Sequence, residues 1–331
     1  MAVRRRDLIT LAGGAVTWPL TARAQQTESV RRIGVLMIFA ESDAEGQGFV
    51  TAFREGLQKL GWIEGQNIRI DIRWGATNPA LIQQLARELV ASMPDLILSS
   101  GTPTTLVLLK QTRTIPIIFA TVVDPVGSGL VTSLPQPGGN VTGFINLEGS
   151  MSGKWLELLK EIAPRVKRVV FLFNPATATY ADYFLGPFKA AAASVAVEAI
   201  VAPVRDTSEL TSAVVGQARE PNGGLLIMPD AFTVARRAEI TSLAAQYRLP
   251  AVYPFRFFAE LGGLLSYGND QTDNYRRAAI YADRILKGAK PSELPVQIPV
   301  KFELVINLKT AKALDLDVPS LLKHRADELI E

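Results

Sequence analysis

Residues 115–144 read IPIIFATVVDPVGSGLVTSLPQPGGNVTGF, and this stretch decides the fold. Ile115–Ala120 is a short apolar run of β-branched and aromatic residues, which predicts a strand buried on both faces of a parallel sheet. The polar residues Thr121 and Asp124 follow, so the strand should end there. Because ligands bind outside the carboxyl ends of strands in open α/β sheets, Thr121 and Asp124 are candidate binding residues.

Two turns separate this strand from the next one. Asp124 and Pro125 form a natural cap and first residue for a helical turn. The run Pro137-Gly138-Gly139-Asn140 favours a tight turn, because paired glycines allow positive φ, and a strand should begin at Val141. A structural alternative stays open for both polar residues, in which Asp124 only caps a helix and Asn140 only shapes a turn.

Strands and helices alternate on the amino-terminal side of this stretch. The expected order is a strand at 33–39, a helix at 47–60, an edge strand at 67–74, a helix at 81–90, a strand at 95–98 and a helix capped by Thr102 with Pro103 at its first position. With right-handed crossovers, this βαβαβ order predicts a doubly wound parallel sheet.

The pattern restarts after Phe144. The expected order is a helix at 154–162, a strand at 166–173, a helix at 183–193, a strand at 196–201, a helix at 208–218, a strand at 224–228, a helix at 234–247 and short strands at 250–253 and 263–267. A helix at 273–286 and a strand at 302–308 should then cross back. The fold class is therefore α/β, with two Rossmann-like lobes of parallel sheet joined by a hinge. The first lobe is expected at 31–146 with part of 271–300, and the second at 147–270 with part of 301–331.

Residues 1–24 have the three regions of an export signal. Three arginines (residues 4–6) precede a short apolar run at 8–18, and Ala22-Arg23-Ala24 is a small-x-small cleavage motif. Arg5-Arg6 also has twin-arginine spacing, although Arg4 stands where Ser or Thr is usual. Twin-arginine export is the first expectation, with the ordinary secretory route as the alternative and cleavage after Ala24.

Removal of this segment balances the charge of the chain. Four of the 35 basic residues and one of the 32 acidic residues lie in it, so 31 of each remain. The mature chain has no basic excess of the kind that binds nucleic acid or anionic membranes. Cysteine is absent, which excludes disulfides and a lipid-modified terminal cysteine. We expect a periplasmic protein without an anchor.

Several separated motifs resemble one known family. They are Asp124-Pro125-Val126-Gly127, the turn and strand at 137–143, Phe173-Asn174-Pro175, Ser266-Tyr267-Gly268, the run KFELVIN at 301–307 and Arg325-Ala326-Asp327-Glu328. In this order they are similar to the ABC transporter substrate-binding proteins that include tryptophan- and tyrosine-binding components. The resemblance covers Arg32 to Glu331. It implies the type 1 periplasmic binding protein fold, with a three-strand hinge and a small ligand clamped between the lobes.

The resemblance also implies where the ligand would bind. A helix beginning near Thr102 and Thr104 would offer backbone N–H groups to a ligand carboxylate, with structural capping as the alternative for Thr102. Asp124 would pair with an ammonium group. From the second lobe, Asn174 and Asp230 stand at strand ends. Tyr253 and Phe255 would supply an aromatic wall, with Tyr253 the better candidate because it follows a strand directly, whereas Phe257 and Phe258 are assigned to the core.

The chain departs from the family pattern at one position. Relatives of the tryptophan binders carry Asp-Asn-Thr where this chain has Asp230-Ala231-Phe232-Thr233, so the identity of the ligand does not carry over. Arg256 adds a cation that would receive a carboxylate or an aromatic face, or else lie solvated on a helix. Aromatic or branched amino acids and small aromatic carboxylates are the expected ligand classes.

The inventory of reactive groups argues against an enzyme. His324 is the only histidine, and no phosphate-binding loop or Gly-x-Ser-x-Gly elbow is present. We expect no cofactor, no bound metal and no catalysis. The first functional hypothesis is a monomeric solute-binding protein that delivers a small ligand to an inner-membrane ABC permease with its ATPase. A periplasmic sensor for a membrane receptor and an exported enzyme remain alternatives.

Overall fold

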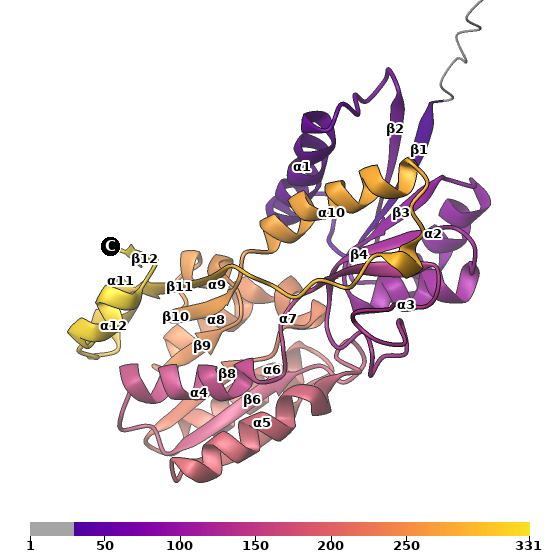
Figure 1. Cartoon of the computed structure of the whole chain (residues 1–331). Coiled ribbons are helices and arrows are strands. Elements are labelled where there is room, and N and C mark those ends of the chain that lie inside the picture. Colours follow the sequence, from indigo (N-terminus) through magenta and orange to yellow (C-terminus); the bar gives the residue numbers. More distant parts are fainter. Residues whose placement is uncertain (1–29) are drawn as a thin grey trace, which may run out of the picture.

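The computed structural model describes residues 30–331 and contains the two expected α/β lobes (Figure 1). Each lobe has its own sheet and its own cluster of buried apolar side chains. The fold class predicted from the sequence is confirmed. The signal segment at 1–24 lies outside the described residues.

The first lobe contains a five-stranded sheet in which every pair is parallel. Its strands, in spatial order, are β2 (Ile68–Trp74), β1 (Arg31–Met37), β3 (Leu96–Ser99), β4 (Ile117–Val122) and β5 (Val141–Ile145). All residues of β3, β4 and β5 are buried, which explains their unbroken apolar character. β2 lies at the edge, as its alternation of Ile with charged residues predicts.

Four helices cover this sheet. They are α1 (Ala44–Lys59), α2 (Pro79–Ala91), α3 (Thr102–Gln111) and α10 (Gln271–Leu286). α10 comes late in the chain yet packs in the first lobe, where the ring of Tyr275 stacks on Phe49 with centroids 4.8 Å apart. Gly56 lets α1 and α10 approach, because a Cβ there would lie 2.7 Å from the Cβ of Ala279.

The second lobe contains a seven-stranded sheet. Its strands, in spatial order, are β12 (Glu328–Ile330), β11 (Phe302–Asn307), β10 (Leu265–Asn269), β9 (Ala251–Tyr253), β8 (Gly223–Ile227), β6 (Arg168–Phe173) and β7 (Glu198–Pro203). The sheet is parallel except that β11 runs antiparallel to β10 and carries β12 with it. The reversal occurs because the chain enters β11 from the first lobe.

The helices of the second lobe are α4 (Met151–Ile162), α5 (Ala181–Ser194), α6 (Thr207–Ala218), α7 (Ala231–Ala235), α8 (Arg237–Gln246), α9 (Arg256–Glu260), α11 (Leu308–Ala313) and α12 (Ser320–Arg325). A 3₁₀ turn at Pro291–Glu293 packs beside β5 of the first lobe. The expected single helix at 234–247 is wrong. Asp230 caps a separate short helix, and the chain leaves helical geometry at Arg236, where φ is −106° and ψ is 20°.

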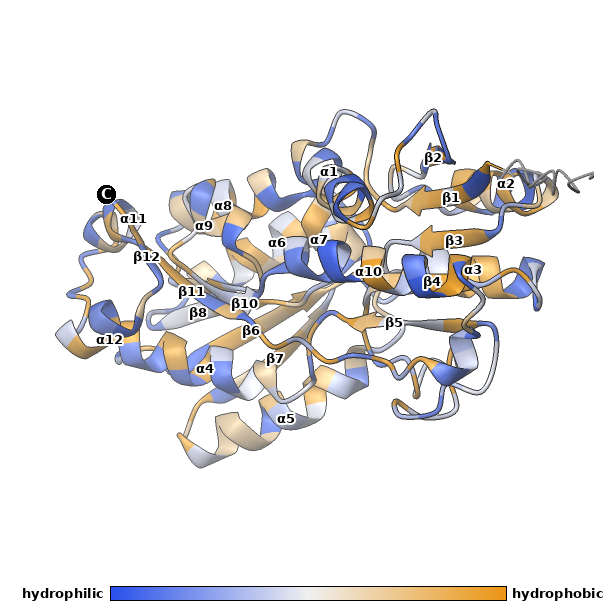
Figure 2. Cartoon of the chain, turned by 45° about the horizontal axis from the view of Figure 1, so that its top comes forward, coloured by the Kyte–Doolittle hydropathy of each residue, from blue (hydrophilic) through white to orange (hydrophobic). Residues whose placement is uncertain are grey.

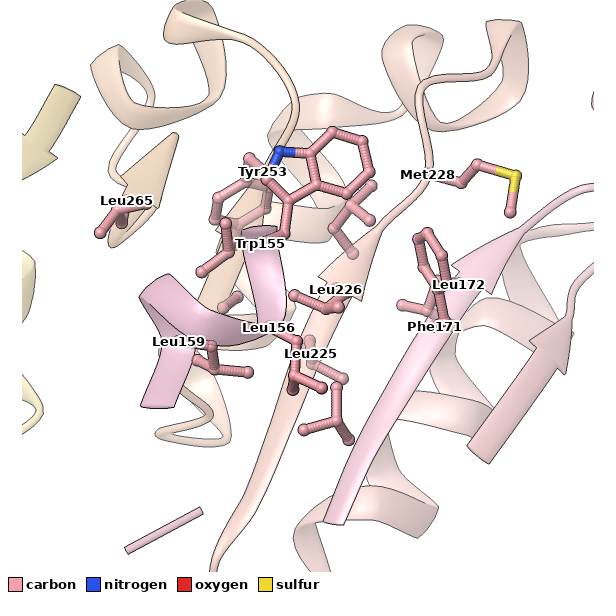
Figure 3. Close-up of a cluster of buried hydrophobic side chains, with 14 of the residues drawn as sticks. Trp155, Leu156, Leu159, Phe171, Leu172, Leu225, Leu226, Met228, Tyr253 and Leu265 are labelled. Atoms are coloured by element: carbon pink, nitrogen blue, oxygen red, sulfur yellow. The ribbon is translucent and has the colours of Figure 1, made fainter. Parts of the chain in front are cut away.

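Part of the core of the second lobe lies between α4 and the sheet. Trp155 is fully buried there, and its indole nitrogen donates to the Tyr267 carbonyl at 2.6 Å. Figure 3 shows Trp155, Leu156 and Leu159 of α4 directed at buried residues of β6 and β8. The first lobe also separates apolar from polar residues. In Figure 2, β1 and β3 are coloured mainly as hydrophobic, whereas α1 carries hydrophilic bands. Among the helices of residues 30–331, none is long and apolar enough to span a membrane.

The chain crosses between the lobes three times, near residues 146, 270 and 301, and side chains join the crossings. Gln271 donates an amide hydrogen bond to Asn146 Oδ1 at 3.0 Å, linking the first two crossings. Lys301 pairs with Asp270 at 2.9 Å, linking the second and third. The three crossings therefore form one connected hinge.

Candidate functional site

A cavity of about 160 Å³ lies between the lobes, against the hinge. The first lobe supplies the loop after β1, the start of α3 and the ends of β4 and β5, and the second lobe supplies the residues after β8 and the start of α9. These are the carboxyl ends of the parallel strands in both sheets, the edge at which open α/β sheets bind ligands.

The start of α3 lines the cavity without a side-chain cap. Gly101, not Thr102, is the N-cap residue, so the expected capping by Thr102 is wrong. Gly101 has φ of +88°, which a residue with a Cβ rarely adopts, and it places no side chain over the helix end. Pro103 has no N–H, so the first turn offers the N–H groups of Thr102 and Thr104, which have no partner within the helix and with the macrodipole favour a negatively charged group.

The hydroxyls of Thr102 and Thr104 are occupied within the first lobe. Thr102 Oγ1 accepts from the N–H of Val123 at 3.0 Å and so ties α3 to the end of β4. Thr102 still lines the cavity. Thr104 is fully buried, donates to the Ser100 carbonyl at 2.5 Å and is not among the lining residues.

Thr121, Asn146 and Gln271 form the hinge side of the cavity. Thr121 is the residue predicted from the end of the buried strand, whereas sequence reasoning missed the other two. Behind them, Asn274 of α10 donates to the carbonyls of Ala120 and Ile145, both at 3.0 Å. α10 thus holds the ends of β4 and β5 in place.

Asp230 lines the cavity and is almost fully buried, with 3% of its surface exposed. Its Oδ1 accepts from Thr177 and from the N–H groups of Phe232 and Thr233, at 2.6 to 3.1 Å. Its Oδ2 accepts from the N–H of Asn174 at 3.1 Å. Burial raises the pKa of Asp230 to about 6. The four hydrogen bonds lower the pKa, but their effect is smaller than that of burial.

Asn174 supports Asp230 from behind and does not line the cavity. Its side-chain amide donates to the Arg205 carbonyl at 3.0 Å, and its Oδ1 accepts from the N–H of Ala176 at 2.8 Å. Asn174 therefore shapes the loop after β6 and orients the Asp230 carboxylate.

The aromatic wall is formed by residues other than Tyr253. Phe39, Tyr180 and Phe255 line the cavity. Tyr253 is 1% exposed, stacks on Phe258 with centroids 5.0 Å apart, and belongs to the cluster of buried side chains in Figure 3. β9 ends at Tyr253, so the chain leaves the sheet before Phe255 and turns that ring into the cleft.

Arg256 and Asp124 do not line the cavity either. Arg256 pairs with Glu260, Glu303 and Glu328 at 2.6 to 3.1 Å on the surface of the second lobe. These carboxylates raise the pKa of Arg256. Asp124 has φ of +44° and accepts from the N–H of Gly127 at 2.9 Å, so its side chain closes a turn.

One ion pair crosses the cleft beside the cavity. Asp43 of the first lobe caps α1 through Oδ1, and its Oδ2 lies 2.9 Å from Arg237 Nη1 of the second lobe. Only 14% of the Asp43 side chain and 18% of the Arg237 side chain are exposed. The sequence places Asp43 just after a buried strand and before a helix, a signal that could have identified it as a site residue.

Comparison with known proteins gives a consistent picture. A family described as "ABC transporter substrate binding protein" matches residues 32–330. The tyrosine-binding protein of Clostridioides difficile (strain R20291) is 27% identical over 279 residues, or 83% of this chain and 77% of the relative. A conserved domain protein from Vibrio cholerae has a crystal structure with a TM-score of 0.84 and 30% identity, covering 91% of this chain and all of that one. The structure of an ABC domain from Streptococcus pneumoniae in complex with L-Trp also has a TM-score of 0.84, with 27% identity and the same coverage.

Proposed function

The chain belongs to the ABC transporter substrate binding protein family, and on that premise we propose that it is the periplasmic solute-binding component of an importer. It would clamp a small ligand between its lobes and present the closed form to an inner-membrane permease that works with an ATPase. The export signal expected at residues 1–24 supports a periplasmic location.

The observation that carries this proposal is the cavity between the lobes. A ligand held there touches both lobes only when they are together, so it favours the closed arrangement over the open one. Asp43 and Arg237 add an ion pair that joins the two lobes, and opening of the cleft would separate them. The hinge beside the cavity allows the change without disturbing either sheet.

The ligand class we propose is an amino acid or an aromatic carboxylate. Two relatives support it, because one is named as tyrosine-binding and another was solved with L-Trp. The cavity offers the start of α3 for a carboxylate and the rings of Phe39 and Phe255 for an apolar body. A binder without catalysis and without a cofactor is the role that fits this lining.

A ligand screen with a measurement of closure tests the proposal. The purified mature protein is unfolded and refolded to remove carried-over ligand, and thermal shift is measured with amino acids, aromatic acids, sugars, purines and nicotinamide cofactors. A ligand at 100 times its dissociation constant adds about 2.7 kcal/mol. We expect a hit among the first two classes, recovered chemically unchanged, with a smaller radius of gyration by X-ray scattering. Conversion of the hit, or a response to a redox cofactor alone, would contradict the proposal.

Export is tested separately. Replacing Arg5 and Arg6 with Lys should keep the protein out of the periplasmic fraction if the twin-arginine route is used. Periplasmic recovery of this variant would assign the ordinary secretory route. Recovery of the wild-type protein in the cytoplasm alone would contradict the periplasmic assignment.

A further inference from the structure

The cavity contains few charged groups. Among the described residues that line it, Asp43 and Asp230 are the only acids, and none is Lys or Arg. A zwitterionic amino acid would need one of these two carboxylates for its ammonium group, because a buried cation requires an opposite charge and hydrogen-bond acceptors. The hydrogen bonds of the two acids therefore decide whether the site suits an amino acid.

Most of the accepting capacity of Asp230 is already used within the second lobe. A carboxylate offers about four lone-pair positions. The Asp230 carboxylate already accepts from four protein donors, namely Thr177 Oγ1 and the N–H groups of Asn174, Phe232 and Thr233. Oδ1 holds the cap of α7, so an ammonium group would be left with Oδ2, where the N–H of Asn174 already donates.

Asp43 is occupied in a different way. Its Oδ1 accepts from the N–H groups of Glu45 and Gly46, and its Oδ2 accepts from Arg237. An ammonium group placed beside Asp43 would meet the guanidinium of Arg237, a like charge, or would have to displace it. The amide oxygen of Asn146 is uncharged and already accepts from Gln271, so it cannot replace a carboxylate as the partner of a buried cation.

The rest of the lining suits an anion with an apolar body. Gly101 leaves the first turn of α3 open towards the cavity, and Thr121 adds a hydroxyl. The opposite side, from the second lobe, presents Ala231, Val234 and Phe255. The lining thus combines donors from the first lobe with apolar side chains from the second, and both of its carboxylates already hold protein donors.

We infer that the site selects a small apolar or aromatic carboxylate that lacks an α-ammonium group. This inference rests on the proposed function, because it takes the cavity as the ligand site, and it narrows the ligand class stated there. Ala231 offers a position at which a partner for an ammonium group can be introduced. It is the first residue of α7, lines the cavity and carries no polar group.

Matched ligand pairs test the inference by calorimetry on the refolded mature protein at pH 7.5. The pairs are 3-phenylpropanoate with L-phenylalanine, 3-(indol-3-yl)propanoate with L-tryptophan, and 4-methylpentanoate with L-leucine. We expect at least one carboxylate to bind, with an affinity at least tenfold above that of its amino acid, because the ammonium group loses its water and gains no partner. The amide 3-phenylpropanamide should bind more weakly than 3-phenylpropanoate.

A designed variant gives a second, independent readout. Ala231→Asp places a carboxylate in the first turn of α7, where an acid is favourable, and facing the cavity. We expect it to move the preference towards the amino acid of each pair by at least tenfold. Ala238→Asp on the exposed surface of α8 is the matched control and should leave the preference unchanged.

The outcomes separate this inference from the proposed function. An amino acid that binds as tightly as its partner carboxylate, or an Ala231→Asp variant with unchanged preference, would overturn the inference and leave a solute-binding role intact. Absence of binding by every member of the three pairs would overturn the inference and contradict the ligand class of the proposed function. A preference for carboxylates that the variant reverses would support both.

Discussion

The carboxylate of Asp43 caps α1 of the first lobe and at the same time lies 2.9 Å from the guanidinium of Arg237 in the second lobe. Oδ1 accepts the hydrogen bonds that cap α1, and Oδ2 forms the ion pair between the lobes. Because the two functions use different atoms, they can be separated by substitution.

Removing the charge of either partner should weaken ligand binding without unfolding a lobe. Asp43→Asn keeps an oxygen for the cap, and Arg237→Gln keeps a polar side chain. Each should cost about 2 kcal/mol or more of binding energy, because the pair joins the two lobes and is largely buried, so that loss of one partner leaves the other charge unpaired. Calorimetry with the tightest ligand from the screen measures this effect.

A double-mutant cycle then shows whether the two residues act together. The double variant should bind about as well as either single variant. Additive losses would contradict the assignment. Arg248→Gln is the control, since its pair with Asp315 is exposed on both sides and should leave binding unchanged.

The buried carboxyl of Asp230 should make stability depend on pH. Its pKa of about 6 lies above the value of 3.8 for an ordinary carboxyl, so between these values the folded state binds more protons than the unfolded state. The free energy of unfolding should therefore fall as the pH rises from about 4 to about 6, by up to ~3 kcal/mol, and level off above that. Denaturant unfolding at several pH values measures the slope.

Other groups titrate in the same range, so the comparison with Asp230→Asn isolates this one. The variant keeps an oxygen for the N–H groups of Phe232 and Thr233 and has no titration. The free energy of unfolding of the wild type, minus that of the variant, should fall as the pH rises from about 4 to about 6. A constant difference would show that the carboxyl has an ordinary pKa.

Tyr253→Phe should stabilise the second lobe. The Tyr253 hydroxyl is buried and has no hydrogen-bond partner among residues 30–331. Removing it should raise the free energy of unfolding by about 1 kcal/mol, because a desolvated hydroxyl is costly. Ligand affinity should not change, since Tyr253 does not line the cavity. Denaturant unfolding measures the change in stability, and calorimetry measures ligand affinity. A loss of affinity would show that Tyr253 is a ligand residue after all.

Asp124→Ala should affect the fold and leave binding alone. The substitution removes the hydrogen bond to Gly127 and places Ala at φ of +44°, so about 1 kcal/mol or more of stability should be lost. Affinity should stay within about twofold. Asp124→Gly is the matched control, because glycine accepts this backbone conformation and loses only the hydrogen bond. Weaker binding by both variants at unchanged stability would assign Asp124 to the ligand instead.

The layout of the sheets was predictable because buried parallel strands read as apolar runs. The strand expected at 302–308 covers all of β11, and the one expected at 33–39 shares residues 33–37 with β1. The family resemblance was also confirmed, by the match over residues 32–330. The division of the expected helix at 234–247 was not foreseen, although Asp230 and Thr233 form a capping box that marks the start of α7.

The site was harder to predict because it is made by contacts between lobes. Thr102, Thr121, Asp230 and Phe255 are at strand ends or helix starts and do line the cavity. Asn146 and Gln271 lie on crossings of the hinge, and their meeting depends on where the chain returns to the first lobe. The expected strand at 250–253 ends where β9 ends, but Tyr253 was misjudged because a strand end alone does not show that this last ring packs in the core.

The late position of α10 has a consequence for synthesis. When the ribosome has made the first 270 residues, the surface of α1 that Tyr275 and Ala279 cover in the finished protein is still bare, and the carbonyls of Ala120 and Ile145 have not met Asn274. The second sheet also lacks β11 and β12 at that moment. A nascent chain would thus hold two unfinished lobes at once, exposed to proteases and chaperones, and both would be completed by the same last 60 residues.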